Sequence, residues 1–505
     1  MLNPPVKANS SSPSQFTIIR LPETLSPLFP PHIRIITPAE KIASDLGSTL
    51  SPSSSIYLPS DENWTNETTQ RWNQWNAPSY VVSVKPAIKE DVQKVLQYAA
   101  RNKVPFLATG GGHGYSGTLG ALNNGLELDM GYFKSVKVDA GKNRLIIGGS
   151  VRFRELISPV YAAGKAFPVG ACPCVGASGA SLGGGIGFWS GFYGAISDSL
   201  VSVEIVTGTG TLLTASESQN SDLFWAVKGA GHNFGVVTSF TFKVYDSPNG
   251  GQAMNADMTF PLSRNGSLWA FAKSFAGKQP KELSLGFSIL ASPVTQELVI
   301  VVNAIYVGPL AQGRALIKPL LDLTPQNTNI SYIAWKDVPY AAKYGGPAKS
   351  CDTRPLDVPH AVNLYQVDIE GLTAAVEYLN DTIPNTPALK GTVFALTQYS
   401  TYGFQQHTPD SSAFPYRDVI IFAQIDVTAS KSSDLPTINS FTKSFRDRLQ
   451  KISGKDHLEV YTNLAHGDEG AAAWYSKKNV PRLRKLKKTY DPSSLFNFYN
   501  SVNVD

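Results

Sequence analysis

Two nucleophilic side chains stand in glycine-rich surroundings. His113 lies in the run Thr109-Gly-Gly-Gly-His-Gly-Tyr-Ser116, and Cys172 comes just before a glycine-rich block that ends at Gly187. Glycines leave the backbone bare, so successive N–H groups can curl into a nest that binds an anion such as a pyrophosphate. An imidazole or a thiol beside such a nest can bond covalently to a bound electrophile. The stretch 109–187 is therefore predicted to be a cofactor pocket.

Composition limits the class of protein. The chain has 505 residues, enough for two lobes with large cores, and its 42% apolar and 16% charged residues are typical of globular proteins. A net charge of +5 is too small to imply nucleic-acid binding. No run approaches the roughly 18 apolar residues that span a bilayer. The three cysteines (172, 174 and 351) have neither zinc spacing nor the pattern of a disulfide framework.

The elements before the first glycine run must position His113. The patterns predict a strand over Tyr80–Pro86, an amphipathic helix over Ile88–Lys103 and a strand over Val104–Ala108. This order indicates an α+β nucleotide-binding arrangement, but not the dinucleotide-binding one. The segment Gly229–Gly235 resembles the dinucleotide fingerprint, yet it follows a predicted helix and precedes a strand, the reverse of what that fingerprint requires.

Beyond Pro248 the pattern changes to alternating apolar residues. This alternation predicts a largely antiparallel sheet, with helices over Leu310–Leu323 and Thr437–Ile452 covering one face. We expect four segments: an N-terminal arm (1–55), the first part of a cofactor domain (56–249), a substrate domain (250–455), and a C-terminal segment that completes the cofactor domain (456–505). The arm is rich in serine and proline and is expected to be extended and only partly ordered.

Further motifs identify a family. They are Gly170-Ala-Cys-Pro-Cys-Val-Gly176, Ala413-Phe-Pro-Tyr-Arg417, Tyr461-Thr-Asn463 and the ending from Tyr490 to Val502. Together with His113 they make the chain resemble the berberine bridge enzyme-like flavoprotein oxidases, which share the vanillyl-alcohol oxidase/p-cresol methylhydroxylase fold. The resemblance extends over about 80–502. The fungal members are most similar, and they include carbohydrate oxidases and oxidases of natural-product pathways.

The resemblance implies an FAD with two covalent bonds, from His113 to the flavin 8α-methyl and from Cys172 to flavin C6. Val175 matches the side chain that lies by flavin C4a, where a small residue is typical of oxygen-reactive members. Tyr461 is then the candidate base, although a tyrosine with a pKa near ~10 needs help to accept a proton. Cys174 replaces the family's usual threonine, and Leu464 replaces the second tyrosine of the Tyr-x-Asn-Tyr motif, which puts the base in doubt.

The remaining predicted site residues follow from the same motifs. Tyr399 and Gln398 are expected on the substrate side. Gln406 and His407 occupy a segment where some relatives keep a polar catalytic group, and the absence of a carboxylate before Asp410 disfavours an acid-based mechanism. The residues expected to contact the cofactor are Thr109, Gly110, Gly111, Gly112, His113, Gly114, Tyr115, Ser116, Gly170, Cys172, Val175, Gly176, Gly179, Gly183, Gly187, Gly235, Val237, Asn463 and Asn500. No metal site is expected.

Each residue type also has a simpler interpretation. A histidine in a glycine-rich turn can be a surface residue, a cysteine a buried inert thiol, and a tyrosine or valine part of the core. The basic run from Arg482 to Lys488 is interpreted as the solvated face of a helix. With Cys172 committed to a cofactor, Cys174 and Cys351 are either free thiols or a pair.

The predicted function is that of an FAD-linked oxidase that takes hydride from a small aromatic or polyketide-like metabolite and reduces O₂ to H₂O₂. The alternatives are a carbohydrate oxidase that makes a lactone, and a flavin-bearing secreted protein without turnover. The expected partners are a small molecule and O₂, and the chain is expected to be monomeric, with no nucleic acid or membrane partner. Sequons at Asn9, Asn63, Asn66, Asn265, Asn329 and Asn380 predict a secreted glycoprotein, although residues 1–15 lack a signal-peptide pattern.

Overall fold

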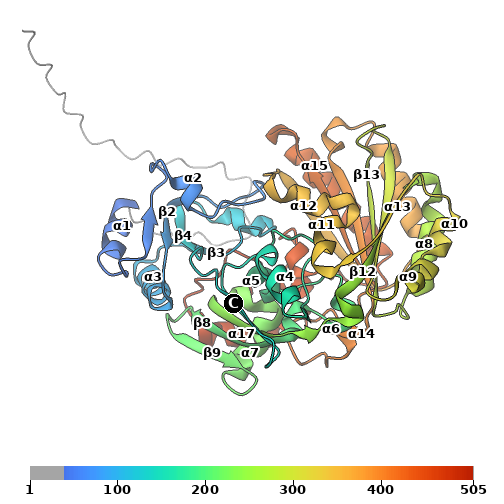
Figure 1. Cartoon of the computed structure of the whole chain (residues 1–505). Coiled ribbons are helices and arrows are strands. Elements are labelled where there is room, and N and C mark those ends of the chain that lie inside the picture. The colour runs from blue at the N-terminus through green and yellow to red at the C-terminus, as the bar shows by residue number, and fades with distance from the viewer. Residues whose placement is uncertain (1–38, 504–505) are drawn as a thin grey trace, which may run out of the picture.

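The computed structural model describes residues 39–503, which form two lobes side by side (Figure 1). The prediction for residues 1–38 lies outside the described residues. For residues 39–55 the predicted arm is wrong, because α1 (Ala39–Gly47) and β1 (Ser55–Tyr57) belong to the first lobe. Ile42 and Leu46 are buried in the core of that lobe, so the amphipathic spacing of α1 outweighs the polar composition around it.

The first lobe contains the predicted strand–helix–strand unit. Its first sheet has the order β1-β2-β4-β3, with β2 (Tyr80–Lys85), β4 (Gly125–Asp129) and β3 (Phe106–Thr109) parallel to one another. The helix α3 (Lys89–Asn102) has acidic residues in its first turn and Arg101 in its last, as the helix dipole favours. Because β3 ends at Thr109, the sheet delivers the first glycine run at its carboxyl edge.

The second sheet of the first lobe is antiparallel. Its order is β5-β6-β10-β8-β9, and the strands are β5 (Val136–Asp139), β6 (Arg144–Gly148), β10 (Gly235–Lys243), β8 (Leu200–Thr207) and β9 (Leu212–Ser216). The helices that pack around it include α4 (Phe153–Ala162), α5 (Ala177–Leu182), α7 (Ser221–Ala230) and α17 (Val480–Tyr490). In α17 the basic run is exposed as predicted, except that Lys487 is buried and paired with Asp491.

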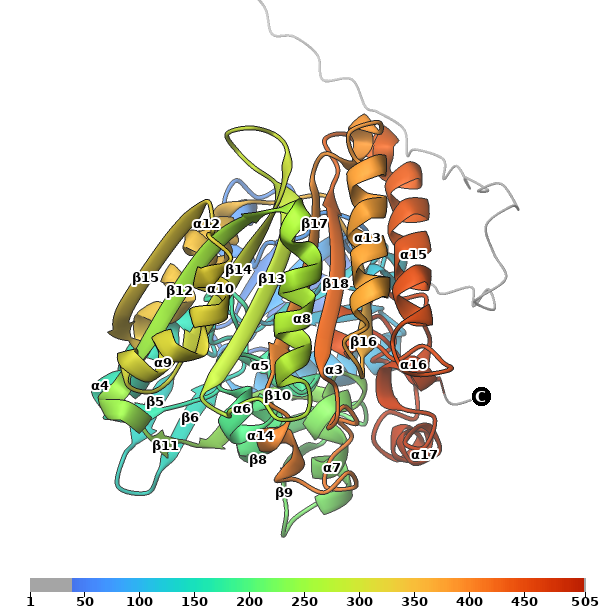
Figure 2. The ribbon, with the colours of Figure 1, turned by 90° about the vertical axis from the view of Figure 1, so that its right-hand side faces the viewer.

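The second lobe is a seven-stranded antiparallel sheet of order β15-β12-β14-β13-β17-β18-β16. Its strands are β12 (Gln252–Pro261), β13 (Leu283–Ala291), β14 (Leu298–Tyr306), β15 (Asn327–Ala334), β16 (Asp357–Leu364), β17 (Thr392–Tyr399) and β18 (Ile421–Thr428). One face is covered by α8 (Asn265–Phe275), α13 (Ile369–Thr382) and α15 (Leu435–Lys451) (Figure 2). The predicted helix over 310–323 is split into α9 (Leu310–Leu316) and α10 (Lys318–Asp322), whereas α8 and α13 were not predicted.

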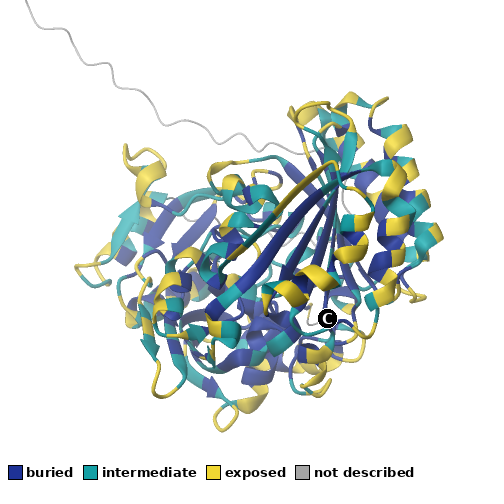
Figure 3. Cartoon of the chain, turned by 45° about the vertical axis from the view of Figure 1, so that its right-hand side comes forward, coloured by how far each residue is buried: buried dark blue, intermediate teal, exposed yellow. Residues whose placement is uncertain are grey.

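The other face of this sheet is turned toward the first lobe. In β17, Phe394 and Leu396 are fully buried against the helices, whereas Val393, Ala395 and Thr397 on the opposite face are half-buried. The short helices α11 (Val338–Ala341) and α12 (Gly346–Lys349) lie between this face and the first lobe (Figure 1). The strands of this lobe are mostly buried, whereas the outer faces of its helices are exposed (Figure 3).

Among the helices of residues 39–503, none has the length and apolar composition of a membrane span.

Candidate functional site

The two glycine-rich stretches meet at Gly111 and Gly176. A Cβ on Gly111 would lie 2.7 Å from both Cα and N of Gly176, so neither backbone has room for a side chain there. Gly112 has a φ of 71°, in the left-handed region that favours glycine. Within the described chain, the N–H groups of residues 111–115 donate to no other backbone or side-chain group. Such a loop fits the predicted anion-binding nest.

This contact gives a direct prediction for Gly111→Ala. The new Cβ must displace backbone atoms of Gly176, so we expect a loss of roughly 1–3 kcal/mol in the free energy of unfolding. We also expect less bound flavin in the purified protein, because the two loops can no longer close on each other. Denaturant unfolding and flavin absorbance measure both effects. Gly266→Ala in α8, whose nearest neighbour is 3.9 Å away, is the control and should be nearly neutral.

His113 is held against a tryptophan rather than exposed. Its ring stacks on Trp72, with centroids 4.6 Å apart and planes 12° apart, and the Trp72 indole N–H donates to the Ser350 carbonyl at 2.8 Å. Burial and the charges of Arg71 and Arg152 lower the pKa of His113 to about 4, so the imidazole is uncharged at neutral pH. Its Nε2 is buried without a hydrogen-bond partner in residues 39–503. An uncharged ring nitrogen without a partner is suited to bond to a cofactor.

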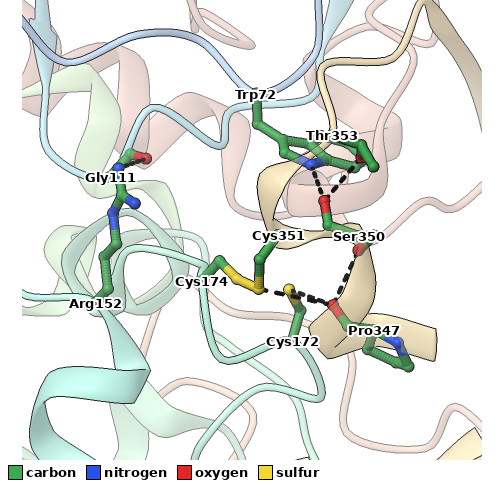
Figure 4. Close-up of a disulfide and its surroundings, with 9 residues drawn as sticks. All are labelled: Trp72, Gly111, Arg152, Cys172, Cys174, Pro347, Ser350, Cys351 and Thr353. Atoms are coloured by element: carbon green, nitrogen blue, oxygen red, sulfur yellow. Dashed lines mark hydrogen bonds between the residues drawn. A yellow bond between two sulfur atoms is a disulfide. The ribbon is translucent and has the colours of Figure 1, made fainter. Parts of the chain in front are cut away.

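Cys172 is the one free cysteine, and the other two form the disulfide Cys174–Cys351. The Cys172 thiol donates to the Pro347 carbonyl at 3.4 Å, and the three sulfur atoms lie within 4.8 Å of one another (Figure 4). Burial raises the pKa of the thiol, while the backbone N–H groups of Cys174 and Val175 oppose that shift. The sequence left open whether Cys174 and Cys351 are free thiols or a pair, and the structure shows a pair. Their disulfide joins the cofactor loop to the segment after α12.

His113 and the disulfide share one cavity of about 350 Å³. Its lining also contains Gly111, one of the glycines of the nest. Six cationic side chains contribute to the lining, against three carboxylates; the cations are Lys85, Lys134, Arg71, Arg152, Arg154 and Arg354. Since Cys172 lies beside the disulfide, the fold brings together the two predicted tethers, which are 59 positions apart in the sequence (172 − 113).

The other predicted cofactor residues mostly shape the backbone of this pocket. Gly110 packs on Gly149, and Gly149 packs on the Val237 carbonyl of β10, which aligns the two sheets behind the nest. Thr109 and Ser116 are buried at the two ends of the nest, and Val175 is half-buried beside Cys172. Close backbone or side-chain neighbours leave no room for a Cβ at Gly170, Gly183, Gly187 and Gly235. At Gly114 the nearest atom is the flexible end of Arg71, 2.6 Å away, and Gly179 is open.

Asn463 and Asn500 serve as structural links. The amide of Asn463 donates to the Ala180 carbonyl at 2.9 Å. The Asn500 side chain accepts from the Ser116 hydroxyl at 2.7 Å and donates to the Thr462 carbonyl at 2.9 Å. The C-terminal segment is thereby bonded to both glycine-rich stretches.

Tyr461, the predicted base, is only 3% exposed. Its phenol oxygen accepts from the Gly185 N–H at 2.9 Å and from Asn463 Nδ2 at 2.7 Å, and burial raises its pKa. It packs with Phe414 and Phe422 in an aromatic cluster. A buried phenol with these contacts fits the simpler interpretation, a packed aromatic residue, and its role as the base stays a prediction.

Of the two residues predicted on the substrate side, one faces the wrong way. Tyr399 lies on the inter-lobe face in the same aromatic cluster as Tyr461. Gln398 faces the helices, where its amide donates to the Ala272 carbonyl of α8 at 3.0 Å, so its predicted site role is wrong. The reason is the period of two along a strand, which sends neighbouring residues to opposite faces. Gln406 is exposed and His407 half-buried in the loop after β17.

A polar cluster on β18 was not predicted from the sequence. The Tyr115 hydroxyl donates to Asp426, and Gln424 Nε2 donates to the Tyr115 oxygen at 3.1 Å and to the Asp426 oxygens at 2.8 and 2.7 Å. Tyr115 comes from the glycine nest two residues after His113, so this cluster joins the two lobes. Gln424 and Asp426 alternate along a predicted strand, and that spacing was the signal for a polar face.

Burial controls protonation in this cluster. Burial and the neighbouring carboxylate of Asp357 raise the pKa of Asp426 to about 7, against the hydrogen bonds from Tyr115 and Gln424. Burial and the Asp426 charge raise the pKa of Tyr115 well above its usual range. Tyr115, Gln424 and Asp426 all keep part of their surface exposed. The pair is therefore a partly buried phenol bonded to a carboxyl group whose pKa is raised to about 7.

Two family models match segments of the chain. The family model described as "FAD binding domain" matches residues 80–216, and the one described as "Berberine and berberine like" matches residues 460–503. The FAD-linked oxidoreductase azaL of Aspergillus niger is 41% identical over 450 residues, covering 88% of this chain and 95% of that protein. The FAD-linked oxidoreductase tazG of Aspergillus terreus is 36% identical, covering 92% and 96%.

Solved structures share the fold. BBE-like 1 of Physcomitrella patens has a TM-score of 0.81 at 22% identity and covers 93% of this chain and all of its own. The xylooligosaccharide oxidase of Myceliophthora thermophila, solved with xylobiose, has a TM-score of 0.79 at 22% identity with the same coverage. The α+β fold, with an FAD lobe and an antiparallel sheet lobe, agrees with the prediction.

Proposed function

Because the chain belongs to the berberine bridge enzyme-like family of FAD-linked oxidoreductases, we propose that it is an oxidase whose FAD is held covalently through His113 and Cys172. The observation that carries this proposal is the meeting of an uncharged, unpartnered imidazole and a free thiol around one glycine nest. Bound FAD would supply the acceptor for a hydride, with O₂ taking the electrons to give H₂O₂. The small, half-buried Val175 beside Cys172 supports oxygen access.

The protein's own acid–base group in this proposal is the Tyr115–Asp426 pair. As the substrate loses a hydride from carbon, the adjacent O–H or N–H must lose a proton. Tyr115 remains a phenol, so it can accept that proton only if its own proton leaves at the same time. Its hydroxyl already donates to Asp426, which can take the proton. The carboxylate thus replaces the tyrosine that the chain lacks at Leu464, contrary to the expectation against an acid-based mechanism.

The proposed substrate is a small aromatic or polyketide-like metabolite. The inter-lobe face of β17 offers short side chains (Val393, Ala395 and Thr397), and aromatic rings close one side of it. Carbohydrate oxidation is the second candidate, supported by the fold shared with the xylooligosaccharide oxidase. Peroxide release over a panel of sugars and phenolic compounds separates the two. A protein whose flavin can be reduced by dithionite, but which is silent across the panel, would be a flavin carrier without turnover.

The covalent bonds are tested by replacing the two tethers. Acid-denatured protein should stay yellow, and so should His113→Ala and Cys172→Ala, because each keeps one bond. The double variant should release its FAD on denaturation. Mass spectrometry of tryptic peptides identifies which peptide carries the flavin. Two unmodified peptides from a yellow, active preparation would contradict the proposal.

We also propose that the protein passes through the secretory pathway. Disulfides persist mainly in oxidising compartments. Cys174 and Cys351 form a disulfide in this protein. Of the sequons in the described chain, Asn63, Asn66, Asn329 and Asn380 are exposed and Asn265 is half-buried, so glycans have room there. Removal of N-glycans from the protein secreted by its native host should lower its apparent mass, and an unchanged mass would contradict this proposal.

A further inference from the structure

A half-buried lysine, Lys343, enters the inter-lobe space from the turn η7 (Lys343–Gly345), between α11 and α12. The carboxylate of Asp257 on β12 accepts from the backbone N–H groups of Lys343 (2.8 Å) and Tyr344 (3.2 Å). Both residues have a φ of 55°, a left-handed conformation that side chains other than glycine rarely adopt. Asp257 also accepts from the Asn255 and Asn303 amides, at 3.0 and 2.7 Å. The strained turn is thus fixed by a fully bonded buried carboxylate.

The lysine side chain lies over the face of the sheet at Gly286. A Cβ on Gly286 would lie 3.2 Å from Lys343 Cε, so the missing side chain makes the path for the lysine. Lys343 Nζ donates to the Ser288 hydroxyl at 3.2 Å, which uses one of the three N–H donors of an ammonium. In the part of the chain that the structure covers, no carboxylate forms an ion pair with it. Burial lowers its pKa, and Asp257 opposes the shift.

Lys343 and the Tyr115–Asp426 pair face the same space. Ser288 on β13 pairs with Ala395 on β17, and Ala395 pairs with Gln424 on β18. Directly paired residues share one face of a sheet, so these three lie in a row. Two strand spacings separate Ser288 from Gln424, about 10 Å. Between them lies the short, half-buried side chain of Ala395, which leaves the face open.

The segment that carries Lys343 also touches the predicted flavin tether. Pro347, four residues further on, accepts the hydrogen bond from the Cys172 thiol, and Cys351 completes the disulfide with Cys174. Lys343 therefore lies between the cofactor loop and the sheet. Asp257 fixes the start of the segment from Lys343 to Cys351, and the disulfide fixes its end.

We propose that Lys343 binds an anionic oxygen of the substrate, a carboxylate or the oxygen of an acidic enol or phenol. This inference rests on the proposed function and narrows its substrate class. An ammonium that is partly removed from water and forms no ion pair is costly, and an anionic ligand would offset that cost. The two free N–H donors would orient the molecule while its reacting O–H or N–H meets Tyr115. Neutral sugars offer no such charge, so the lysine favours an acidic metabolite over a carbohydrate.

The test compares two nearly isosteric probes, benzoate and benzamide, titrated into the flavin-containing protein. Binding is followed by perturbation of the flavin spectrum and by calorimetry. We expect benzoate to bind about tenfold or more tightly than benzamide, as one charge-assisted hydrogen bond allows. Lys343→Met should remove that preference while changing benzamide affinity little, and Lys343→Arg should retain most of it. 4-Nitrophenolate, titrated beside benzoate, distinguishes a preference for an enolate-type oxygen from one for a carboxylate.

The control is Lys273→Met. Lys273 is exposed on α8, which covers the opposite face of the sheet, so its removal should leave both affinities unchanged. Equal binding of benzoate and benzamide to the native protein, or an unchanged preference in Lys343→Met, would overturn the inference. Flavin content confirms that each variant folds. A protein that holds FAD and releases peroxide but shows no preference for anions would refute only this inference, whereas absence of FAD would refute the proposed function.

Discussion

Asp426→Asn is expected to slow reduction of the bound flavin by substrate by about 10²- to 10³-fold, within the usual contribution of a general base. An asparagine amide cannot take the proton that Tyr115 must release, although it has the size to keep the bonds from Gln424. Anaerobic mixing of the enzyme with an active compound from the phenolic panel measures the rate. Substrate affinity should change much less, because Asp426 acts through Tyr115.

The pH dependence of the rate of flavin reduction is a second test of the role of Asp426. The pKa of Asp426 is raised to about 7, so the carboxylate that accepts the proton is present above that pH and is lost below it. The rate of flavin reduction in the native enzyme should therefore rise with pH, with a midpoint near 7, and Asp426→Asn should lose this step. Asp418→Asn, at an exposed position before the same strand, is the control and should behave like the native protein. Equal rates and pH profiles in Asp426→Asn would exclude the relay.

Removal of the disulfide by Cys174→Ser with Cys351→Ser should lower the free energy of unfolding by up to about 5 kcal/mol. The bond closes a loop between residues 177 positions apart, and a cross-link over so long a loop removes much of the conformational freedom of the unfolded chain. Replacing both cysteines avoids leaving a thiol that could exchange with Cys172. Urea unfolding of the native and double-variant proteins measures the difference.

A treatment with reductant provides the comparison for this variant. Dithiothreitol should move the unfolding midpoint of the native protein toward that of the double variant, and should leave the double variant unchanged. Identical midpoints for the native and double-variant proteins would mean that the disulfide does not stabilise the fold. The Gly111→Ala variant, which retains the disulfide, separates this effect from disorder of the cofactor loop.

Local motifs were predictable and cross-lobe contacts were not. His113 and Cys172 were found because glycines and nucleophiles are adjacent in the sequence. The Cys174–Cys351 disulfide links positions 177 apart, and nothing in the sequence near either cysteine indicates its partner. Alternation predicted the strand that carries Asp426, but which strand face meets the first lobe depends on pairing with β17 and β16.

The features that were not predicted from the sequence have related physical causes. Gln398 and Tyr399 are neighbours in sequence, and a single step along the strand decided which of them faces the site. Tyr461 matched a motif, but its burial in an aromatic cluster depends on Phe414 and Phe422, which a local pattern does not reveal. Helix α1 was not predicted because its surroundings in the sequence are polar and only two of its residues, Ile42 and Leu46, are buried.

The span from Lys343 to Cys351, which we call the cassette, is fixed to the rest of the protein by two anchors. One anchor is the carboxylate of Asp257 and the other is the sulfur of Cys174. Between them lie the carbonyl that touches Cys172 and the ammonium on the sheet. A graft of this span into a relative would have to bring both anchors with it. Selection or engineering that alters the preferred metabolite through this cassette would therefore also alter the surroundings of the flavin-linking thiol.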